Sequence, residues 1–525
     1  MARAEVNIIW FKRDLRVHDH RPLIAAIEAG KPVLPLFVIE PDFWALPTSS
    51  RRHWLFVRDC LIELRARLSA LGQSLIVRIG PMRDVLQELS SDFKINAIFA
   101  HEETSHGWSY ARDEAVRDYC YQQVIALHEF PANGVARRFF NRDKWAAMRQ
   151  KRMAETRAIA PDDGALSHDL APLASLDIGA IPAREEALFG APLVEGDITQ
   201  EGGRQAAIHL LRSFLTDRSS AYVANLASPS KAQTSCLRLS PHLVWGTMSS
   251  REVQQTIRNY VKTAKTPLSK SKARSLNAVL SRLSWRCHFM QKLEDQPEIE
   301  FANMHPLYDG LREKEAADDE GAAVHARFAA WAEGRTGYPL VDACMRSLTV
   351  TGWLPFRMRA MLVSFASYHL WLDWRMTAPH LARLFTDFEA GIHYSQFQMQ
   401  SGVTGINTIR IYNPVKQSYE HDPAGVFIRR WCPELAGVSA QWLHEPRLMP
   451  PMEGMAQSFE IGRDYPLPIV ENEVAMRAAK DKIFAIRNQP EFKKFAGQIY
   501  QKMGSRKKIG KRPKKTAATK QMKLL

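Results

Sequence analysis

The sequence predicts an α/β domain followed by a larger all-α domain. Roughly the first 130 residues alternate strand-like and helix-like segments, and strand-like runs disappear after about residue 206. Apolar runs typical of strands lie at 7–11, 32–40, 74–80 and 96–103. Continuous apolar strands separated by helices indicate a parallel sheet covered on both faces. The chain, at 525 residues, is also longer than a single ordinary core requires.

The segment 53–72 predicts a helix between the second and third strands. Its apolar face is formed by Phe56, Cys60, Leu61, Leu64 and Leu68, which follow the helical period. The first strand continues into KRDLRVHDH, and the glycine-rich turn G-x-G-x-x-G that cradles a dinucleotide is absent. We therefore expect a Rossmann-like parallel sheet that does not bind NAD at its first turn.

Composition divides the chain into four parts. We expect the sheet domain at 1–135, a surface-packed connector rich in Ala, Pro and Gly at 136–205, the helical domain at 206–484 and a basic tail at 485–525. Ten of the Lys/Arg and no acidic residue lie at 501–525, so the net charge of +15 leaves 15 − 10 = +5 for the rest. Such a tail is typical of a disordered segment that contacts phosphates or keeps the chain in solution.

Several classes of protein are disfavoured. No run reaches the roughly 18–20 apolar residues of a membrane span, and the start MARAEVNIIWF lacks the features of a signal peptide. We expect a cytoplasmic monomer that does not bind membranes. The six cysteines are scattered without a C-x-x-C pair, which argues against a metal centre, an iron–sulfur cluster or a disulfide framework. We expect buried thiols and no metal.

A long motif in the helical half is more specific. Residues 331–375 read WAEGRTGYPLVDACMRSLTVTGWLPFRMRAMLVSFASYHLWLDWR. This segment resembles the FAD domain of the DNA photolyases and cryptochromes, with its W-x-E-G-x-T-G-Y-P-x-V-D-A-x-M-R-x-L pattern followed by T-G-W, R-x-R and D-W-R. The start IIWFKRDLRVHDHRPL and the segments RIYNPVKQ, FIRRWCPEL and YPLPIV extend the resemblance over about 5–480.

The resemblance implies FAD in an all-α FAD-binding domain and light-driven electron donation to UV-crosslinked pyrimidines flipped out of DNA. It thus implies a photolyase that repairs cyclobutane pyrimidine dimers in single- or double-stranded DNA. The alternatives are a cryptochrome-type blue-light receptor without repair activity and, less compatible with so broad a match, an unrelated FAD electron carrier. Relatives typically hold a second, antenna chromophore of folate, deazaflavin or flavin type, and Glu102 and Glu103 resemble the region that lines it.

The resemblance also assigns cofactor-binding residues. Arg359 and Asp387 match an arginine–carboxylate pair beside the flavin, where a fixed positive charge favours the anionic reduced form. Cys236 and Leu237 replace hydroxyl residues of the phosphate-binding segment. The assigned residues are Tyr222, Thr234, Ser235, Arg238, Leu239, Ser240, Arg286, Arg359, Asp387, Phe388, Glu389 and His393.

His393 falls opposite flavin N5, where relatives carry Asn, Asp or Cys. An imidazole with a pKa near neutrality would make the charge of the flavin sensitive to pH. The alternative is that His393 turns away from the cofactor and bonds a backbone carbonyl.

The lesion pocket departs from the family pattern. Trp285 matches a lesion-facing Trp, but Arg282, Phe356, Ala360 and Met399 replace the Glu, Asn, Met and Trp of dimer-repairing relatives. Relatives that repair (6-4) photoproducts carry His at the positions of Phe356 and Ala360, so the sequence argues against that activity. We expect Trp285, Phe356 and Met399 to wall the pocket, and Arg282 to contact phosphate or a pyrimidine carbonyl.

The path that feeds electrons to the flavin differs as well. Of three Trp positions used by many relatives, only Trp374 is retained, while Phe397 and Gly321 occupy the others. We expect another route through Tyr394, Trp371, Trp353 or Trp374; the alternative is that these rings only pack the core. The residues assigned to catalysis are Trp285, His393, Trp374, Met399, Arg282 and Phe356.

Overall fold

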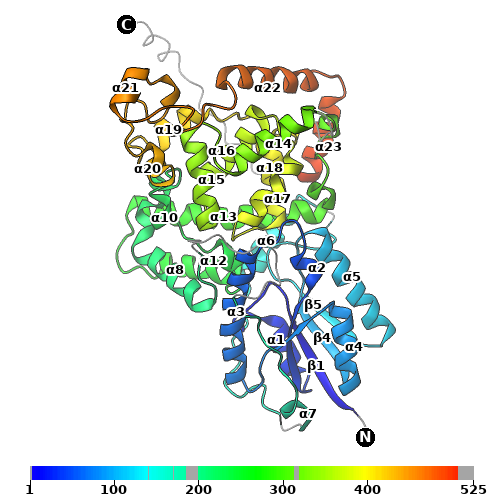
Figure 1. Cartoon of the computed structure of the whole chain (residues 1–525). Helices are drawn as coiled ribbons and strands as arrows, with labels where there is room; N and C mark the ends of the chain where they lie inside the picture. Colours follow the sequence, from blue (N-terminus) through cyan, green and yellow to red (C-terminus); the bar gives the residue numbers. More distant parts are fainter. Residues whose placement is uncertain (1–2, 140, 169–170, 185–198, 313–318, 506–525) are drawn as a thin grey trace.

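The structure is a computed structural model that describes residues 3–505 apart from 140, 169–170, 185–198 and 313–318. Figure 1 shows the N-terminal part of the chain, in blue, as a sheet domain against a larger helical domain in green to red. The predicted fold class is confirmed: a parallel sheet is followed by an all-α domain.

Five parallel strands form the sheet, in the order β3-β2-β1-β4-β5. Four of them coincide with the predicted runs. The fifth is absent from the predicted strands because its sequence, ALHEF, includes His and Glu and is only half-buried. The strands are β1 Ala4–Phe11, β2 Val33–Ile39, β3 Ile76–Ile79, β4 Phe93–His101 and β5 Ala126–Phe130.

Alternate residues of the central strand β1 face opposite layers of helices. Ile9 and Phe11 pack into the core with α1 and α3, whereas Ile8 and Trp10 pack with α4 and α5. Because the sheet is covered on both faces, its strands are apolar throughout, as predicted. The helices of this domain are α1 Arg21–Glu28, α2 Pro41–Trp44, α3 Arg51–Ala70, α4 Met82–Asp92 and α5 Gly107–Gln122.

The helical domain is arranged around the long helix α13, which packs against α18. Its helices are α8 Arg204–Thr216, α9 Tyr222–Asn225, α10 Ala232–Ser235, α11 Ser240–Val244, α12 Ser250–Lys262, α13 Lys270–Asp295, α14 Asp319–Ala332, α15 Pro339–Thr351, α16 Phe356–Ser364, α17 Trp374–Leu384, α18 Ala390–Ser401, α19 Pro414–His421, α20 Val426–Trp431, α21 Pro451–Ala456, α22 Asn472–Arg487 and α23 Phe492–Met503.

The T-G-Y-P-x-V-D motif is a structural clamp inside this domain. Asp342 is fully buried and accepts hydrogen bonds from Thr336 N at 2.8 Å, Thr336 Oγ1 at 2.6 Å, Gly337 N at 3.1 Å and Tyr465 Oη at 2.5 Å. Four donors on one carboxylate satisfy its lone pairs in the absence of water. The motif therefore ties the start of α15 to the segment around Tyr465.

In its described residues the connector contains two helices, α6 (Trp145–Ala154) and α7 (Ala171–Ala174). Trp145 and Met153 of α6 are buried, and α6 contacts α12 of the helical domain. Part of the predicted connector, 185–198, lies outside the described residues. The described part of the connector is therefore packed into the protein through residues near both ends of α6, and it does not lie only on the surface.

The start of the predicted basic tail is helical. Phe492, Ile499 and Met503 of α23 are buried in the core of the helical domain, so the expected boundary at 485 is too early. The predicted boundary is too early because the apolar residues of this basic segment follow a helical spacing and form a buried face. The Lys/Arg-rich part of the tail, 506–525, lies outside the described residues.

In the described part of the chain, no helix is both long and apolar enough to cross a membrane. All six cysteines are buried free thiols.

Candidate functional site

The predicted arginine–carboxylate pair is formed between α16 and the segment that precedes α18. Arg359 donates through Nη1 and Nη2 to Asp387 Oδ1 and Oδ2, at 2.8 and 3.0 Å, in a two-pronged geometry. Burial alone would raise the pKa of Asp387, but Arg359 and the hydroxyl of Ser240 hold it below its ordinary value. Such a bidentate pair keeps both groups charged and fixed in place.

Arg238, between α10 and α11, adds a second guanidinium to this pair. Its charge interacts with both Asp387 and Arg359, and burial lowers its pKa to about 10. The guanidinium lies 4.2 Å from the ring centroid of Trp353, and its backbone φ is +63°, a left-handed conformation rare outside glycine. Because such strain persists only where the surroundings impose it, Arg238 is a positioned residue.

The charges of this cluster do not balance. Arg238, Arg359 and Asp387 sum to 2 − 1 = +1, and Nε of Arg238 is buried without a hydrogen-bond partner among the described residues. A buried cation with an unused donor is costly unless an anion completes it. A flavin nucleotide offers two such anions, a diphosphate and a reduced ring, so the cluster fits FAD.

The hydroxyls expected to bind phosphate are used locally. Thr234 Oγ1 and Ser235 Oγ both donate to the carbonyl of Lys231, at 3.3 and 2.5 Å, and Ser240 hydrogen-bonds Asp387. A hydroxyl that donates its single proton to a carbonyl cannot also donate it to phosphate. The departure of the phosphate segment thus leaves Nε of Arg238 as a donor without a partner among the described residues. Tyr222 and Leu239 are buried in the adjoining core.

Glu389 couples the two domains. Its Oε2 accepts from Arg286 Nη2 at 2.8 Å, and its Oε1 accepts from Arg13 Nη1 at 3.4 Å, across 376 residues of sequence. Arg13 follows β1 and also donates to Ser105 Oγ at 2.8 Å. The predicted cofactor residues Glu389 and Arg286 are therefore brought together, with Arg13 as a partner that the sequence gives no signal to find.

His393 adopts the alternative orientation named above. Its Nε2 donates to the carbonyl of Ala378 at 2.9 Å, and burial lowers its pKa to about 4. The expectation of a pKa near neutrality is therefore wrong, because a desolvated imidazole disfavours its charged form. With its proton on Nε2, His393 offers the lone pair of Nδ1 as an acceptor. Phe388 packs against this ring at 5.1 Å.

An aromatic and cationic surface adjoins the cluster. On α13, Trp285 stacks on Phe289 with ring centroids 5.6 Å apart, and Arg282, one turn earlier, is exposed. The guanidinium of Arg282 lies 5.7 Å from the ring centroid of Phe356. Phe356 is 42% exposed although its side chain is apolar. Phe356 begins α16, one turn before Arg359. Three predicted lesion-facing residues thus lie together; the fourth, Met399, is half-buried on α18.

Two of the expected electron-route residues are adjacent. Trp374 and Tyr394 are buried with ring centroids 6.2 Å apart, and Tyr394 is 5.6 Å from the ring of His393. Trp353 lies instead beneath Arg238. Trp371 is flanked by two cations, Arg312 at 4.7 Å and Lys482 at 4.8 Å.

The sheet domain carries a different kind of cluster at the carboxyl edge of its strands. Arg112 donates to Glu40 at 2.8 Å, Glu103 at 2.6 Å and Asp113 at 2.9 Å, while Lys12 pairs with Asp113 at 3.1 Å. Burial would raise the pKa of Asp113, but Lys12 and Arg112 lower it to about 2. The predicted antenna residue Glu103 is thus committed to protein partners.

Glu102, the other predicted antenna residue, is not committed in this way. Its Oε2 is buried without a hydrogen-bond partner among the described residues, and burial raises its pKa.

Asp14, His20 and His101 gather three potential metal ligands at this edge. His20 Nδ1 accepts from Leu23 N at 3.1 Å, which places the proton of His20 on Nε2. That nitrogen and Nδ1 of His101 both donate to Asp14 Oδ2, at 2.8 and 2.7 Å. Because these ring nitrogens are occupied as hydrogen-bond donors, the cluster is a self-satisfied brace and does not resemble a metal site.

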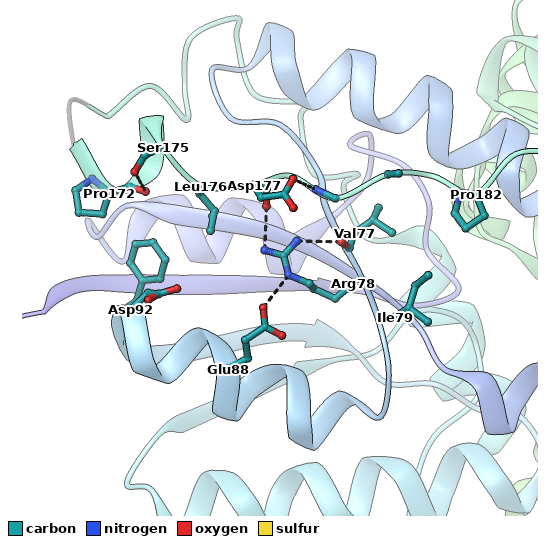
Figure 2. A pocket seen from close by; sticks show the side chains of 13 residues that line it. Val77, Arg78, Ile79, Glu88, Asp92, Pro172, Ser175, Leu176, Asp177 and Pro182 are labelled. Atoms are coloured by element: carbon teal, nitrogen blue, oxygen red, sulfur yellow. Dashed lines mark hydrogen bonds and ion pairs between the residues drawn. The ribbon is translucent and has the colours of Figure 1, made fainter.

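A cavity of about 750 Å³ opens at the outer strand β3, lined by residues of β3, α4 and the segment 172–182. Figure 2 shows its arginine, Arg78, held by Glu88 at 3.3 Å and by the carbonyls of Val77 and Asp177 at 3.0 and 2.9 Å. Its charge is therefore satisfied within the protein.

Gln200, from the connector, is a further residue that contacts the Arg238–Arg359–Asp387 cluster and that the sequence alone does not identify. Its side chain donates to the carbonyl of Arg238 at 2.9 Å and accepts from Arg238 Nη2 at 3.2 Å. The connector therefore fixes the conformation of Arg238, and no motif surrounds Gln200 that could reveal it.

Comparisons with known proteins find two matching family models and several relatives. Residues 279–485 match the FAD binding domain of DNA photolyase, and residues 7–138 match the DNA photolyase domain. Cryptochrome-1 of Arabidopsis thaliana is 30% identical over 88% of this chain and 68% of its own. A deoxyribodipyrimidine photo-lyase of Alkalihalophilus pseudofirmus is 29% identical over 90% of this chain and 97% of its own.

Solved structures show the same fold. A cryptochrome of Synechocystis has a TM-score of 0.79 at 23% identity, covering 92% of this chain and 100% of its own. A class III photolyase of Agrobacterium tumefaciens has a TM-score of 0.76 at 24% identity, covering 93% and 99%.

Proposed function

The chain belongs to the DNA photolyase and cryptochrome family, and we propose that within it the protein is a deoxyribodipyrimidine photolyase that splits cyclobutane pyrimidine dimers in blue light. The observation that carries this proposal is the exposed pair of Arg282 and Phe356 beside the net-positive FAD cluster. A large apolar ring left in water next to a cation is typical of a surface that receives a stacked base and its phosphate.

The side chains divide the work. Arg238 and Arg359 stabilise negative charge on the cofactor, and Asp387 keeps Arg359 charged and oriented. Trp285 and Phe356 hold the flipped lesion by stacking. FAD bound in this domain would supply the light-driven electron transfer that splits the dimer, and Arg238, Arg359 and Asp387 would hold it.

Recovery of thymine absorbance tests the proposal. The purified protein is reduced, mixed with UV-damaged single-stranded or duplex oligo(dT) and illuminated with blue light. We expect light-dependent recovery on at least one substrate. Absence of recovery on both would reject repair and favour the alternative, a blue-light receptor without repair activity.

A Trp285→Ala variant tests the assigned stacking wall. We expect it to bind damaged DNA at least about tenfold more weakly, because stacking on one aromatic ring contributes about 1–3 kcal/mol. Its FAD content should equal that of the wild type, since the ring contacts of Trp285 are with His288 and Phe289 of its own helix. Loss of FAD together with DNA binding would instead assign Trp285 a structural role.

A further inference from the structure

The guanidinium of Arg238 is restrained from two directions. Its central carbon lies 4.2 Å from the ring centroid of Trp353, which fixes its distance from that ring. Gln200 Oε1 accepts from Nη2 of Arg238 at 3.2 Å, which fixes the rotation of the group over the ring. Because a guanidinium is a rigid planar fork, these two contacts together determine where Nε points. Nε is buried without a partner among the described residues, so it is the donor that remains for a ligand.

The amide of Gln200 bonds both the side chain and the backbone of Arg238. Besides accepting from the guanidinium, it donates through Nε2 to the carbonyl of Arg238 at 2.9 Å. The backbone φ of Arg238 is +63°, and a residue with a side chain keeps such a conformation only where its neighbours impose it. The two bonds of Gln200 therefore hold the strained backbone and the guanidinium of Arg238 relative to each other.

The chain that follows Gln200 is seated on helix α3 of the sheet domain. Backbone N–H groups of the connector and of the start of α8 donate to side chains of α3: Gly202 N to Asp59 Oδ2 at 3.3 Å, Gly203 N to Cys60 Sγ at 3.1 Å, and Gln205 N to Glu63 Oε1 at 3.2 Å. The three acceptors lie within about one turn of α3. The position of Gln200 is therefore set by the sheet domain, only two residues from this contact.

The contact with α3 requires glycine at two consecutive positions. A Cβ on Gly202 would collide with the carbonyl oxygen of Phe56, a backbone atom that cannot turn aside. Gly203 has a φ of +91°, which favours glycine over every other residue. The backbones of the connector and of α3 thus approach closely, and this leaves little freedom for the segment that carries Gln200.

Helix α3 also contacts the opposite side of the cofactor cluster. His53 of α3 donates through Nε2 to the carbonyl of Phe385 at 2.8 Å, two residues before Asp387. Its ring stacks on that of Phe388, the residue after Asp387, with centroids 6.3 Å apart. One helix of the sheet domain therefore contacts the segments that position both the carboxylate and the second guanidinium of the cluster.

We propose that Gln200 is a positioning residue for FAD: it holds the guanidinium of Arg238 in the orientation that binds the cofactor, and helix α3 of the sheet domain holds Gln200 in place. The sheet domain thus contributes to cofactor affinity through the connector. The inference rests on the assignment of Arg238 to the FAD site and not on dimer repair, because a blue-light receptor without repair activity would use the same site.

A double-mutant cycle between Gln200 and Arg238 tests the proposal. FAD is removed from the wild type, Gln200→Met, Arg238→Met and the double variant, and the dissociation constant of added FAD is measured from the change in flavin fluorescence. Methionine is about as long as glutamine but has no amide. Gln205→Met is the matched control, because Gln205 is exposed in the adjoining segment and contacts α3 through its backbone N–H.

We expect Gln200→Met to weaken FAD binding about three- to tenfold, because binding must then order a side chain that is rich in rotamers. In the Arg238→Met background the same substitution should have no effect, since no guanidinium is left to hold. Gln205→Met should bind FAD like the wild type. An equal loss in both backgrounds would assign Gln200 a merely structural role and overturn the proposal, as would unchanged affinity in Gln200→Met.

The contribution of α3 is tested by Gly202→Ala. We expect a loss of FAD affinity similar to that of Gln200→Met, because the connector must move away from the carbonyl of Phe56. Combining the two substitutions should add nothing further. If Gly202→Ala does not fold, Asp59→Ala removes the acceptor of Gly202 N and probes the same contact. Full FAD affinity in a folded variant of this contact would overturn the role of α3.

These outcomes are separable from the proposed function because FAD affinity is measured in the dark and without DNA. A wild type that does not repair dimers, while Gln200 and Arg238 remain coupled, would reject repair and retain the positioning role. Repair of dimers without this coupling would do the reverse. Wild-type FAD affinity in Arg238→Met would remove Arg238 from the FAD site and overturn the role of Gln200 with it.

Discussion

The two charge clusters of this protein differ in whether the donor nitrogens of their central arginine all have partners. At the carboxyl edge of the sheet, Arg112 is surrounded by Glu40, Glu103 and Asp113, and its pKa is raised by these carboxylates although burial opposes the shift. In the helical domain, Arg238 and Arg359 share only Asp387. Each donor nitrogen of Arg112 bonds a carboxylate, whereas Nε of Arg238 is buried without a hydrogen-bond partner among the described residues. The unused donor of Arg238, more than the presence of charge, is what marks the second cluster as a candidate binding site.

Acidification has the largest expected effect, and it acts on both regions. Burial lowers the pKa of eight histidines to about 4 or below. They are His53, His101, His106, His242, His288, His369, His380 and His393. Below pH 6.5 the unfolded chain binds protons that the folded chain cannot bind, so the unfolding free energy falls by up to about 1.4 kcal/mol per pH unit for each histidine.

We expect full stability above pH 7, and a steep loss between about pH 6.5 and 4, in urea unfolding of the FAD-loaded protein. A stability that stays constant down to pH 5 would show that these histidines are not buried as neutral rings.

Removal of the single carboxylate of the cofactor cluster has the next largest effect. Asp387→Asn leaves the partly buried guanidinium groups of Arg238 and Arg359 without a counter-charge, which costs up to about 3–5 kcal/mol. We expect loss of FAD during purification and a lower urea midpoint. Asp464→Asn is a suitable control, because Asp464 pairs with Arg463 at the surface. Equal effects of the two substitutions would contradict the special role of Asp387.

A smaller effect is expected when aromatic residues are replaced, and it should differ from one residue to another. Tyr394→Phe and Trp374→Phe should slow light-driven reduction of FAD, because the two rings are adjacent and close to His393. Trp371→Phe should leave the rate unchanged, since Arg312 and Lys482 disfavour a radical cation on Trp371. The rate of FAD photoreduction, measured by absorbance, checks this order. A rate that falls most in Trp371→Phe would contradict it.

The smallest expected effect is that of pH on the flavin. Because the pKa of His393 is lowered to about 4 and its Nε2 is bonded to Ala378, this residue stays neutral throughout the physiological range. The absorption spectrum of protein-bound FAD, recorded under illumination, should therefore be the same at pH 6 and pH 8 in the wild type. A spectral transition between pH 6 and pH 8 that His393→Asn abolishes would instead show that His393 titrates beside the flavin.

Features that depend on a local pattern of residues can be predicted from the sequence, whereas features that depend on contacts between distant parts of the chain cannot. Strands β1 to β4 are readable because a doubly covered parallel sheet requires apolar runs, and β5 is not, because an outer strand tolerates His128 and Glu129. The Arg359–Asp387 pair is predictable from a motif. The pairing of Glu389 with Arg13 is not, since it depends on how two domains pack.

Local geometry also limits what the sequence reveals. Thr234 and Ser235 have the composition of a phosphate site, but their hydroxyls donate to Lys231 within one helical turn. The resemblance likewise assigns His393 the position of a proton donor, yet burial and the carbonyl of Ala378 determine its protonation. Residue type indicates the chemistry available, and the surrounding partners decide which part of it remains free.

The comparison of the two clusters is tested most directly by Arg238→Met and Arg112→Met, with FAD removed and then added back. In the absence of FAD, Arg112→Met should lower the unfolding free energy by about 3–5 kcal/mol, because it leaves buried carboxylates without a partner. Arg238→Met should leave it unchanged or raise it, and should weaken FAD binding at least about tenfold through loss of a charge-assisted hydrogen bond. A variant Arg238→Met that is as unstable as Arg112→Met and still binds FAD with wild-type affinity would contradict the account.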